Sequence, residues 1–218
     1  MSTLYTWNTP NGQKPAILLE ELEASYQLAP INITNGDQFG EDFLSVNPNG
    51  KIPALVDEEV TVFESGAIVQ YLAEKYGAFL GDTGQGRASA LAWSYWQVGG
   101  LGPTIGQWAH FAGAADLAKS EADISYATDR FLKESIRLLQ VLNHRLQEST
   151  YLAGNSYSIA DVMSYPWVIG GLHRLIPVVG NKLPDLSATQ RWIDDIAARP
   201  AVQRAMSRLE QLETSSRQ

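Results

Sequence analysis

The chain has 218 residues, with 16 lysines and arginines against 24 aspartates and glutamates, so its formal net charge is −8. Its basic residues are scattered, which argues against an extended nucleic-acid-binding surface and against binding to a membrane surface, because both need clustered positive charge. The absence of cysteine excludes disulfide bonds, thiolate metal sites and a nucleophilic protein thiol.

The first 76 residues carry the patterns of a small α/β domain. Apolar periodicity and turn residues predict, in chain order, a strand at 3–7, a helix at 14–23, a strand at 28–33, two short strands at 52–56 and 60–63, and a helix at 64–75. The order βαβ followed by ββα predicts a mixed sheet.

A glycine-rich segment follows, with glycines at 77, 81, 84 and 86, and it predicts a linker. Beyond it, strand signals are scarce and the patterns predict helices at 87–97, 121–147, 158–169 and 186–199. We therefore expect an α/β domain at 1–77, a linker at 78–86 and an all-helical domain at 87–218.

The predicted helix that begins near Ser158 has a recognisable start signal. Ser158 and Asp161 are spaced as an N-cap residue and its N3 partner, which satisfy each other's free backbone amides. We interpret this capping box as a folding signal and not as part of an active site.

Several functional classes lack their motifs. The three histidines, at 110, 144 and 173, have no metal-ligand spacing, and the hydrolase and P-loop signatures are absent, so we predict no metal. The N-terminus has no secretory pattern and no stretch reaches the length of a membrane span, which predicts a soluble, cytoplasmic protein.

Two short segments have chemical potential. In NPNGKIPAL, residues 47–55, Pro53 stands at the start of a strand. A cis Ile52-Pro53 bond would hold the Ile52 backbone open for a peptide-like ligand, whereas the alternative is a loop that leads into an edge strand.

The second segment is FESGAI, residues 63–68, which follows a strand and opens a helix. Free amides at the helix N-terminus and the Ser65 hydroxyl suit a carboxylate, and Glu64 suits an ammonium group, so the pair fits an amino-acid head group. The alternative is an ordinary first helical turn with a favourably placed acidic residue.

Taken together and in this order, the two segments resemble the thioredoxin-like, glutathione-binding domain of cytosolic glutathione transferases, and the helical second half resembles the same family. The motifs TPNG at 9–12, QF at 38–39 and WQVGGLGP at 96–103 are similar to those of the bacterial Nu class and of the related fungal nitrogen-regulator branch.

The resemblance implies a glutathione site. In this family the backbone before a cis-proline, here Ile52 before Pro53, pairs with the cysteinyl part of glutathione. Glu64 and Ser65 match the residues that hold its γ-glutamyl part. Near the glycyl end, the resemblance implies two further contacts, Lys51 and Gln38, although a solvated loop lysine is the alternative for Lys51.

The resemblance also implies how the thiol is activated. Thr9 and Asn11 match the Nu-class pair that donates hydrogen bonds to the sulfur, and either of them could favour the thiolate. Tyr5 lies within the predicted strand, so we interpret it as a packing residue. Arg130 matches a position that would hold a second glutathione, although it could instead pair with Glu134 on the same helix face.

These matches predict an enzyme of the glutathione transferase family that reduces disulfide bonds with glutathione, bound in reduced form or as the oxidised dimer. A transferase that conjugates glutathione to hydrophobic electrophiles and a glutathione-binding regulatory protein without turnover are the alternatives. The predicted partners are glutathione, a small disulfide or electrophile and a second copy of the chain, with no nucleic acid or membrane.

Overall fold

The computed structural model describes residues 1–113, 121–180 and 183–215. The chain packs as two compact units, one formed by Met1–Leu80 with Asp195–Gln218 and the other by Gly81–Asp194. These units are defined by packing, so the predicted division at 1–77, 78–86 and 87–218 stays a prediction.

The first unit is built on a four-stranded sheet. Its elements are β1 (Ser2–Thr6), α1 (Pro10–Glu21), β2 (Tyr26–Pro30), a short 3-10 turn (Asp37–Phe39), α2 (Glu41–Val46), β3 (Ala54–Asp57), β4 (Val60–Phe63), α3 (Ser65–Tyr76) and α9 (Pro200–Ser215). The strand order is β2-β1-β3-β4, with β1 and β2 parallel and the other two pairs antiparallel. The predicted mixed sheet and thioredoxin-like fold are thereby confirmed.

The side chains of strand β1 alternate between the two faces of the sheet. The side chains of Ser2, Leu4 and Thr6 are buried, as the alternation of a strand requires. The intervening Tyr5 stacks at an angle on Phe43 of α2, with ring centroids 6.1 Å apart. Tyr5 is therefore a packing residue, as predicted from the sequence.

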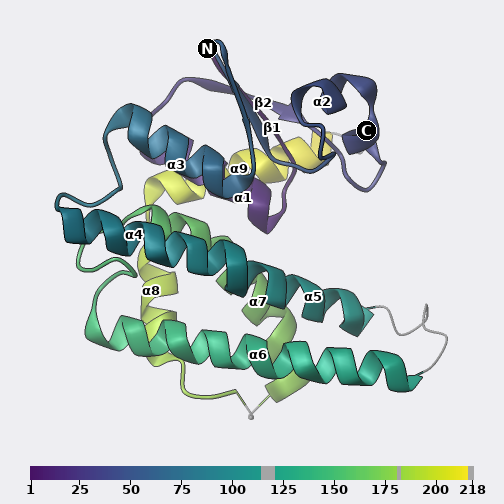
Figure 1. Ribbon diagram of the computed structural model, residues 1–218, viewed down its shortest axis with the longest axis vertical. Coiled ribbons are helices and arrows are strands. Elements are labelled where there is room, and N and C mark those ends of the chain that lie inside the picture. The colour runs from purple at the N-terminus through teal and green to yellow at the C-terminus, as the bar shows by residue number, and fades with distance from the viewer. Residues whose placement is uncertain (114–120, 181–182, 216–218) are drawn as a thin grey trace. The chain divides into compact units, whose positions relative to one another are not determined.

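The C-terminal helix α9 packs against α1 and β2, so the two ends of the chain share one unit (Figure 1). Arg199 forms a two-bond ion pair with Glu21 at 2.6 and 2.8 Å. Glu20 accepts hydrogen bonds from Arg204 at 2.9 Å and Arg208 at 2.7 Å. The sequence patterns did not predict α9.

The second unit is helical in its described part, which confirms the predicted class of this region. Its helices are α4 (Gly84–Trp96), a π-helical turn (Gln97–Leu101), α5 (Gly102–Gly113), α6 (Glu121–Glu148), α7 (Ile159–Val179) and α8 (Ser187–Ala197), the last of which runs on into the first unit. Helix α4 begins earlier than the predicted residue 87, because the Thr83 hydroxyl caps it by accepting a hydrogen bond from the Gly86 amide at 3.0 Å.

The capping box of α7 is present as predicted. Asp161 is fully buried, and its carboxylate accepts hydrogen bonds from the Ser158 amide and hydroxyl, both at 3.0 Å. The same carboxylate also accepts from the Leu152 amide at 3.0 Å and from the Trp192 indole at 2.9 Å. A local folding signal thus joins the start of α7 to the preceding loop and to α8.

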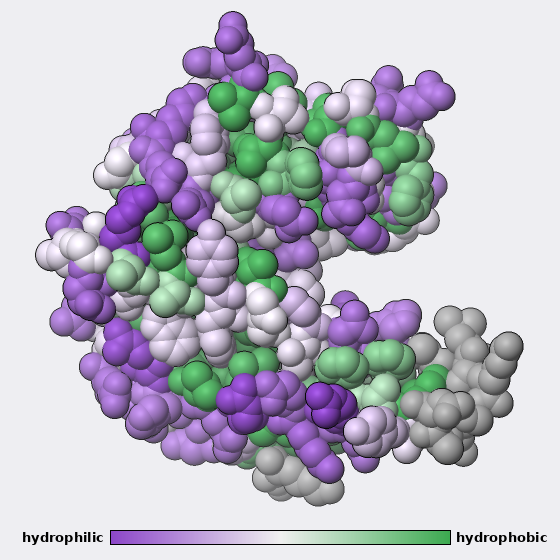
Figure 2. Space-filling view, viewed as in Figure 1, coloured by the Kyte–Doolittle hydropathy of each residue, from purple (hydrophilic) through white to green (hydrophobic). Residues whose placement is uncertain are grey.

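Hydrophilic and hydrophobic residues are interspersed on the face shown in Figure 2. Large apolar side chains exposed on the first unit include Phe39, Val60 and Phe63. Among the described residues, none of the helices combines the length and the apolarity that crossing a membrane would need.

Candidate functional site

The strand register brings three of the predicted segments to one end of the sheet. Tyr5 pairs with Ala54, so the chain that leaves β1 toward Thr9 runs beside the chain that enters β3. Ala54 also pairs with Phe63, which places the end of β4 beside the same point. The turn after β1, the loop before β3 and the start of α3 therefore converge.

The first of these segments is the turn that carries Thr9 and Asn11. Thr9 is the N-cap of α1, and its hydroxyl oxygen accepts a hydrogen bond from the Gly12 amide at 3.2 Å. Because a hydroxyl can accept and donate at once, this cap leaves the Thr9 proton available to a ligand. Asn11 follows in the first turn of α1, where the helix dipole favours negative charge.

Gly12 is required by the close approach of the chain at this turn. A Cβ atom at residue 12 would lie 2.1 Å from the Trp7 carbonyl oxygen and 2.4 Å from the Thr6 hydroxyl. Only glycine fits there, so Gly12 fixes the distance between the end of β1 and the first turn of α1.

The second segment is the loop before β3. The Ile52-Pro53 peptide bond is cis. This is the isomer that would hold the Ile52 backbone open for a peptide-like ligand. Pro53 is buried, whereas Ile52 is half-buried. The buried Asn47 side chain organises the loop by donating to the Lys51 carbonyl at 2.6 Å and accepting from the Asn49 amide at 3.0 Å. This role of Asn47 was not predicted.

The third segment is the start of α3. Strand β4 ends at Phe63 and α3 begins at Ser65, so Glu64 alone turns the chain. Its backbone has φ 70° and ψ 118°, a conformation that costs a residue other than glycine about 1–3 kcal/mol. Such strain is held where the surroundings fix it and often marks a ligand site. The side chain of Glu64 is exposed and Ser65 is buried.

Lys14 joins the first and third segments, and sequence reasoning missed it. Its side chain is only 2% exposed, and its ammonium donates a hydrogen bond to the Ser65 hydroxyl oxygen at 3.2 Å. Burial lowers the pKa of Lys14 to about 7, against the opposing effect of the negative charge on Glu64. The sequence gives no distinctive signal for this role, because a lysine in a helical pattern usually faces solvent.

Gln38 and Lys51 are also brought together. A Cβ at Gly50 would lie 3.4 Å from the Gln38 carbonyl oxygen, so the turn that carries Gln38 packs on the loop that precedes Lys51. The side-chain oxygen of Gln38 is buried and accepts no hydrogen bond from the described residues. Lys51 is exposed.

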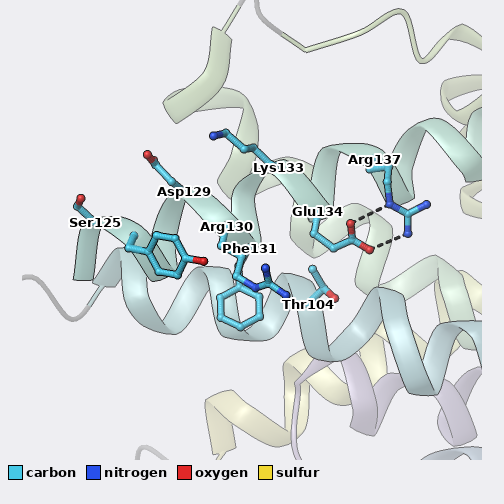
Figure 3. A pocket seen from close by; sticks show the side chains of 9 residues that line it. Thr104, Ser125, Asp129, Arg130, Phe131, Lys133, Glu134 and Arg137 are labelled. Carbon is cyan, nitrogen blue, oxygen red and sulfur yellow. Dashed lines mark hydrogen bonds and ion pairs between the residues drawn. The ribbon is translucent and has the colours of Figure 1, made fainter. Parts of the chain in front are cut away.

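Arg130 lies on α6, in the second unit, where it lines a surface pocket of about 790 Å³ with Thr104 and Phe131 (Figure 3). The predicted alternative partner, Glu134, instead forms a two-bond ion pair with Arg137 at 2.6 and 2.8 Å. Arg130 still lowers the pKa of the Glu134 carboxyl, although less than Arg137 does.

Chemically, the converging segments offer a helix N-terminus with a donor hydroxyl at Thr9, a backbone edge at Ile52, and the carboxylate of Glu64 and the hydroxyl of Ser65 at the start of α3. This set suits a small peptide that carries its own reactive group, since the chain has no cysteine to supply one. Within the described residues, histidine, aspartate and glutamate form no cluster that could hold a metal ion.

Comparisons with known proteins give a consistent result. Residues 2–74 match the N-terminal domain of glutathione S-transferases, and residues 103–200 match the C-terminal domain. A protein of Escherichia coli named disulfide-bond oxidoreductase YfcG is 43% identical in an alignment of 213 residues, and the match covers 94% of each chain.

Solved structures agree with this match. A glutathione transferase from Pseudomonas putida, with one glutathione disulfide bound per subunit, has a TM-score of 0.86 and 36% identity over 94% of this chain and 90% of that one. A family member from Pseudomonas fluorescens with two glutathiones bound has a TM-score of 0.85 and 34% identity over 94% of this chain and 92% of that one.

Proposed function

Because the chain belongs to the glutathione S-transferase family, we propose that it binds glutathione and uses the glutathione thiol to reduce small disulfides. The observation that carries the disulfide chemistry is the 43% identity, over 94% of both chains, with a protein named disulfide-bond oxidoreductase. The predicted resemblance to the Nu class agrees with that relative.

We assign the parts of glutathione to the converging segments of the first unit. The Ile52 backbone would pair with the cysteinyl part, while Glu64 and Ser65 would bind the ammonium and carboxylate of the γ-glutamyl part. The exposed ammonium of Lys51 would attract the glycyl carboxylate. Gln38 would lie near the glycyl end, because the turn that carries it packs on the loop before Lys51.

Thr9 and Asn11 would activate the thiol by hydrogen bonding to the sulfur. A thiol with a pKa of about 8.5 is only about 3% ionised at pH 7. Lowering that pKa to about 6.5 would ionise about three-quarters of it and corresponds to about 2.7 kcal/mol of stabilisation. One or two hydrogen bonds and the N-terminus of α1 provide energies of this size, so no protein base is needed.

The sulfur chemistry then takes place between ligands. One glutathione thiolate attacks a sulfur of the substrate disulfide, forming a mixed disulfide and releasing the first substrate thiolate, which takes up a proton. A second glutathione thiolate attacks the glutathione sulfur of the mixed disulfide, which forms oxidised glutathione and releases the second thiolate. We assign Arg130, as a cation for an anionic peptide, to the second glutathione.

The direct test is reduction of a small symmetrical disulfide by glutathione, followed through a coupled glutathione reductase. We expect turnover well above the uncatalysed exchange, and Arg130→Ala should reduce it much more than it reduces conjugation. A rate equal to the uncatalysed exchange would contradict the oxidoreductase proposal.

The role of the two sulfur donors is tested by the pH dependence of the rate. We expect Thr9→Ala or Asn11→Ala to raise the apparent pKa of the bound thiol, because the lost hydrogen bond had favoured the thiolate. Thr9→Ser keeps both the hydroxyl and the helix cap and should leave the profile nearly unchanged. Unchanged profiles in both alanine variants would refute both assignments.

The second candidate is conjugation of glutathione to hydrophobic electrophiles, which the aromatic side chains of Tyr126 and Phe131 in the pocket around Arg130 favour. A panel of electrophiles tests it. Tight binding of glutathione without turnover of either substrate type would leave a regulatory binding protein as the function.

We also propose a cytoplasmic homodimer, and light scattering at micromolar concentration should give twice the chain mass.

A further inference from the structure

Lys14 occupies an unusual position for a lysine. It lies in the second turn of α1 with 2% of its surface exposed, although lysine is almost never fully buried without a partner. Its Nζ atom lies 3.2 Å from the Ser65 hydroxyl oxygen. The buried ammonium of Lys14 therefore contacts the side chain of the first residue of α3.

The hydrogen bond between these groups has a defined direction. An ammonium group has three N–H donors and no acceptor, so the Ser65 oxygen must accept. The proton on the Ser65 hydroxyl then points away from Lys14 and is available to a ligand at the start of α3. A neutral amine has a lone pair, so after deprotonation of Lys14 the serine could donate to the amine instead.

The surroundings place this change near neutral pH. Burial lowers the pKa of Lys14 to about 7, and Glu64 has the opposite, smaller effect. Helices α3 and α9 pack against α1 and carry other charges. The described bonds of these charges include those of Lys75 to Asp57, Glu74 to Gln70, Arg204 and Arg208 to Glu20, and Glu213 to Asn8.

We propose that Lys14 is a positioning residue of the glutathione site, which fixes the Ser65 hydroxyl as a donor to the γ-glutamyl carboxylate and couples ligand binding to the uptake of a proton. The carboxylate adds a negative charge close to a buried ammonium, and this favours the protonated form of Lys14. The inference rests on the proposed function, because it takes the ligand to be glutathione and its carboxylate to bind at Ser65.

Linkage gives the sign of the effect. The ligand binds best when Lys14 is protonated, so binding draws a proton from solution wherever the free protein has lost it. With the free lysine half-protonated near pH 7, we expect uptake of about half a proton there. The dissociation constant should rise about tenfold between pH 7 and pH 8.5.

The experiment is calorimetric titration of the full chain with S-methylglutathione at pH 7 in two buffers of different ionisation enthalpy. This probe has no thiol, so ionisation of the sulfur cannot contribute protons to the measurement. The slope of the apparent enthalpy against the buffer ionisation enthalpy gives the number of protons taken up. The titration is repeated up to pH 8.5.

Two variants separate positioning from a merely structural role. Lys14→Met removes the charge at similar volume. This variant should bind the ligand more weakly than the wild type at pH 7 and should take up no proton on binding. Its dissociation constant should not show the tenfold rise between pH 7 and pH 8.5. Lys14→Arg keeps a charge that does not titrate, so it should restore binding without restoring the proton uptake. Circular dichroism verifies that each variant is folded.

Binding by the wild-type protein without proton uptake at pH 7 would overturn this inference and leave the proposed function standing. Equal proton uptake in wild type and Lys14→Met would do the same. Failure of the wild-type protein to bind S-methylglutathione at all would overturn both proposals. If the arginine variant does not fold, the comparison of wild type with the methionine variant still decides the question.

Discussion

Lys14 has a cost for folding as well as a proposed benefit for binding. Its folded pKa of about 7 lies far below the ordinary value of 10.5, which corresponds to a burial cost on the order of 5 kcal/mol at low pH. An unfolded lysine keeps its proton up to about pH 10.5, so between pH 7 and 10.5 the unfolded state binds more protons. The contribution of Lys14 to stability therefore improves as pH rises through this window.

We accordingly expect Lys14→Met to be more stable than the wild type, by a few kcal/mol at pH 6, because methionine has no charge to desolvate. The advantage should shrink steadily as the pH rises from 7 to 10. Urea unfolding at pH 6, 8 and 10 measures it, with Lys133→Met, an exposed lysine on α6, as the control. An advantage independent of pH would contradict the titration of Lys14.

At this scale the sequence predicted the residues that carry visible local signals. The sequence left two alternatives open at Pro53, and the structure has the cis bond. Glu64 and Ser65 lie between a strand and a helix, as their motif predicted. Lys14 could not be predicted, because its importance comes from a contact with a residue 51 positions away. Only packing of α1 on α3 creates that contact.

Among the helices, α7 depends most visibly on one side chain. We expect Asp161→Ala to destabilise the protein by about 3–5 kcal/mol, because it leaves the buried donors of Leu152, Ser158 and Trp192 without their acceptor. Asp161→Asn keeps one acceptor oxygen and should lose less. Urea unfolding followed by circular dichroism measures both variants, and a loss below about 1 kcal/mol for alanine would refute this role.

The helices that sequence analysis missed have weak local patterns for physical reasons. Helix α5 contains three glycines and begins with Gly102-Pro103, residues that usually interrupt helices. Helix α2 is only six residues long. Helix α9 buries small side chains, two of them Ala201 and Ala205, so its apolar pattern in the sequence is weak.

At the scale of the whole molecule, the packing of α9 predicts that the first unit is stable only when α9 is present. We expect removal of residues 198–218 to lower the melting temperature markedly and to abolish glutathione binding, because it uncovers the apolar side of α1 and breaks the Arg199–Glu21 ion pair. Thermal unfolding and calorimetric titration test this. Arg204→Gln, which removes one solvent-exposed ion pair, should change stability only slightly, because water screens such pairs. If the truncated chain melts at the same temperature as the full chain, the first unit does not depend on α9.

The same arrangement has a consequence for biosynthesis. On the ribosome, residues 1–80 emerge before Gly81–Asp194, yet the helix that completes their unit, α9, is translated only after Gly81–Asp194. Gly81–Asp194 is continuous in the chain, so this unit can fold while translation continues. The proposed glutathione site would thus be assembled only after α9 has been translated, and until then a nascent chain would expose the uncovered side of α1 to chaperones.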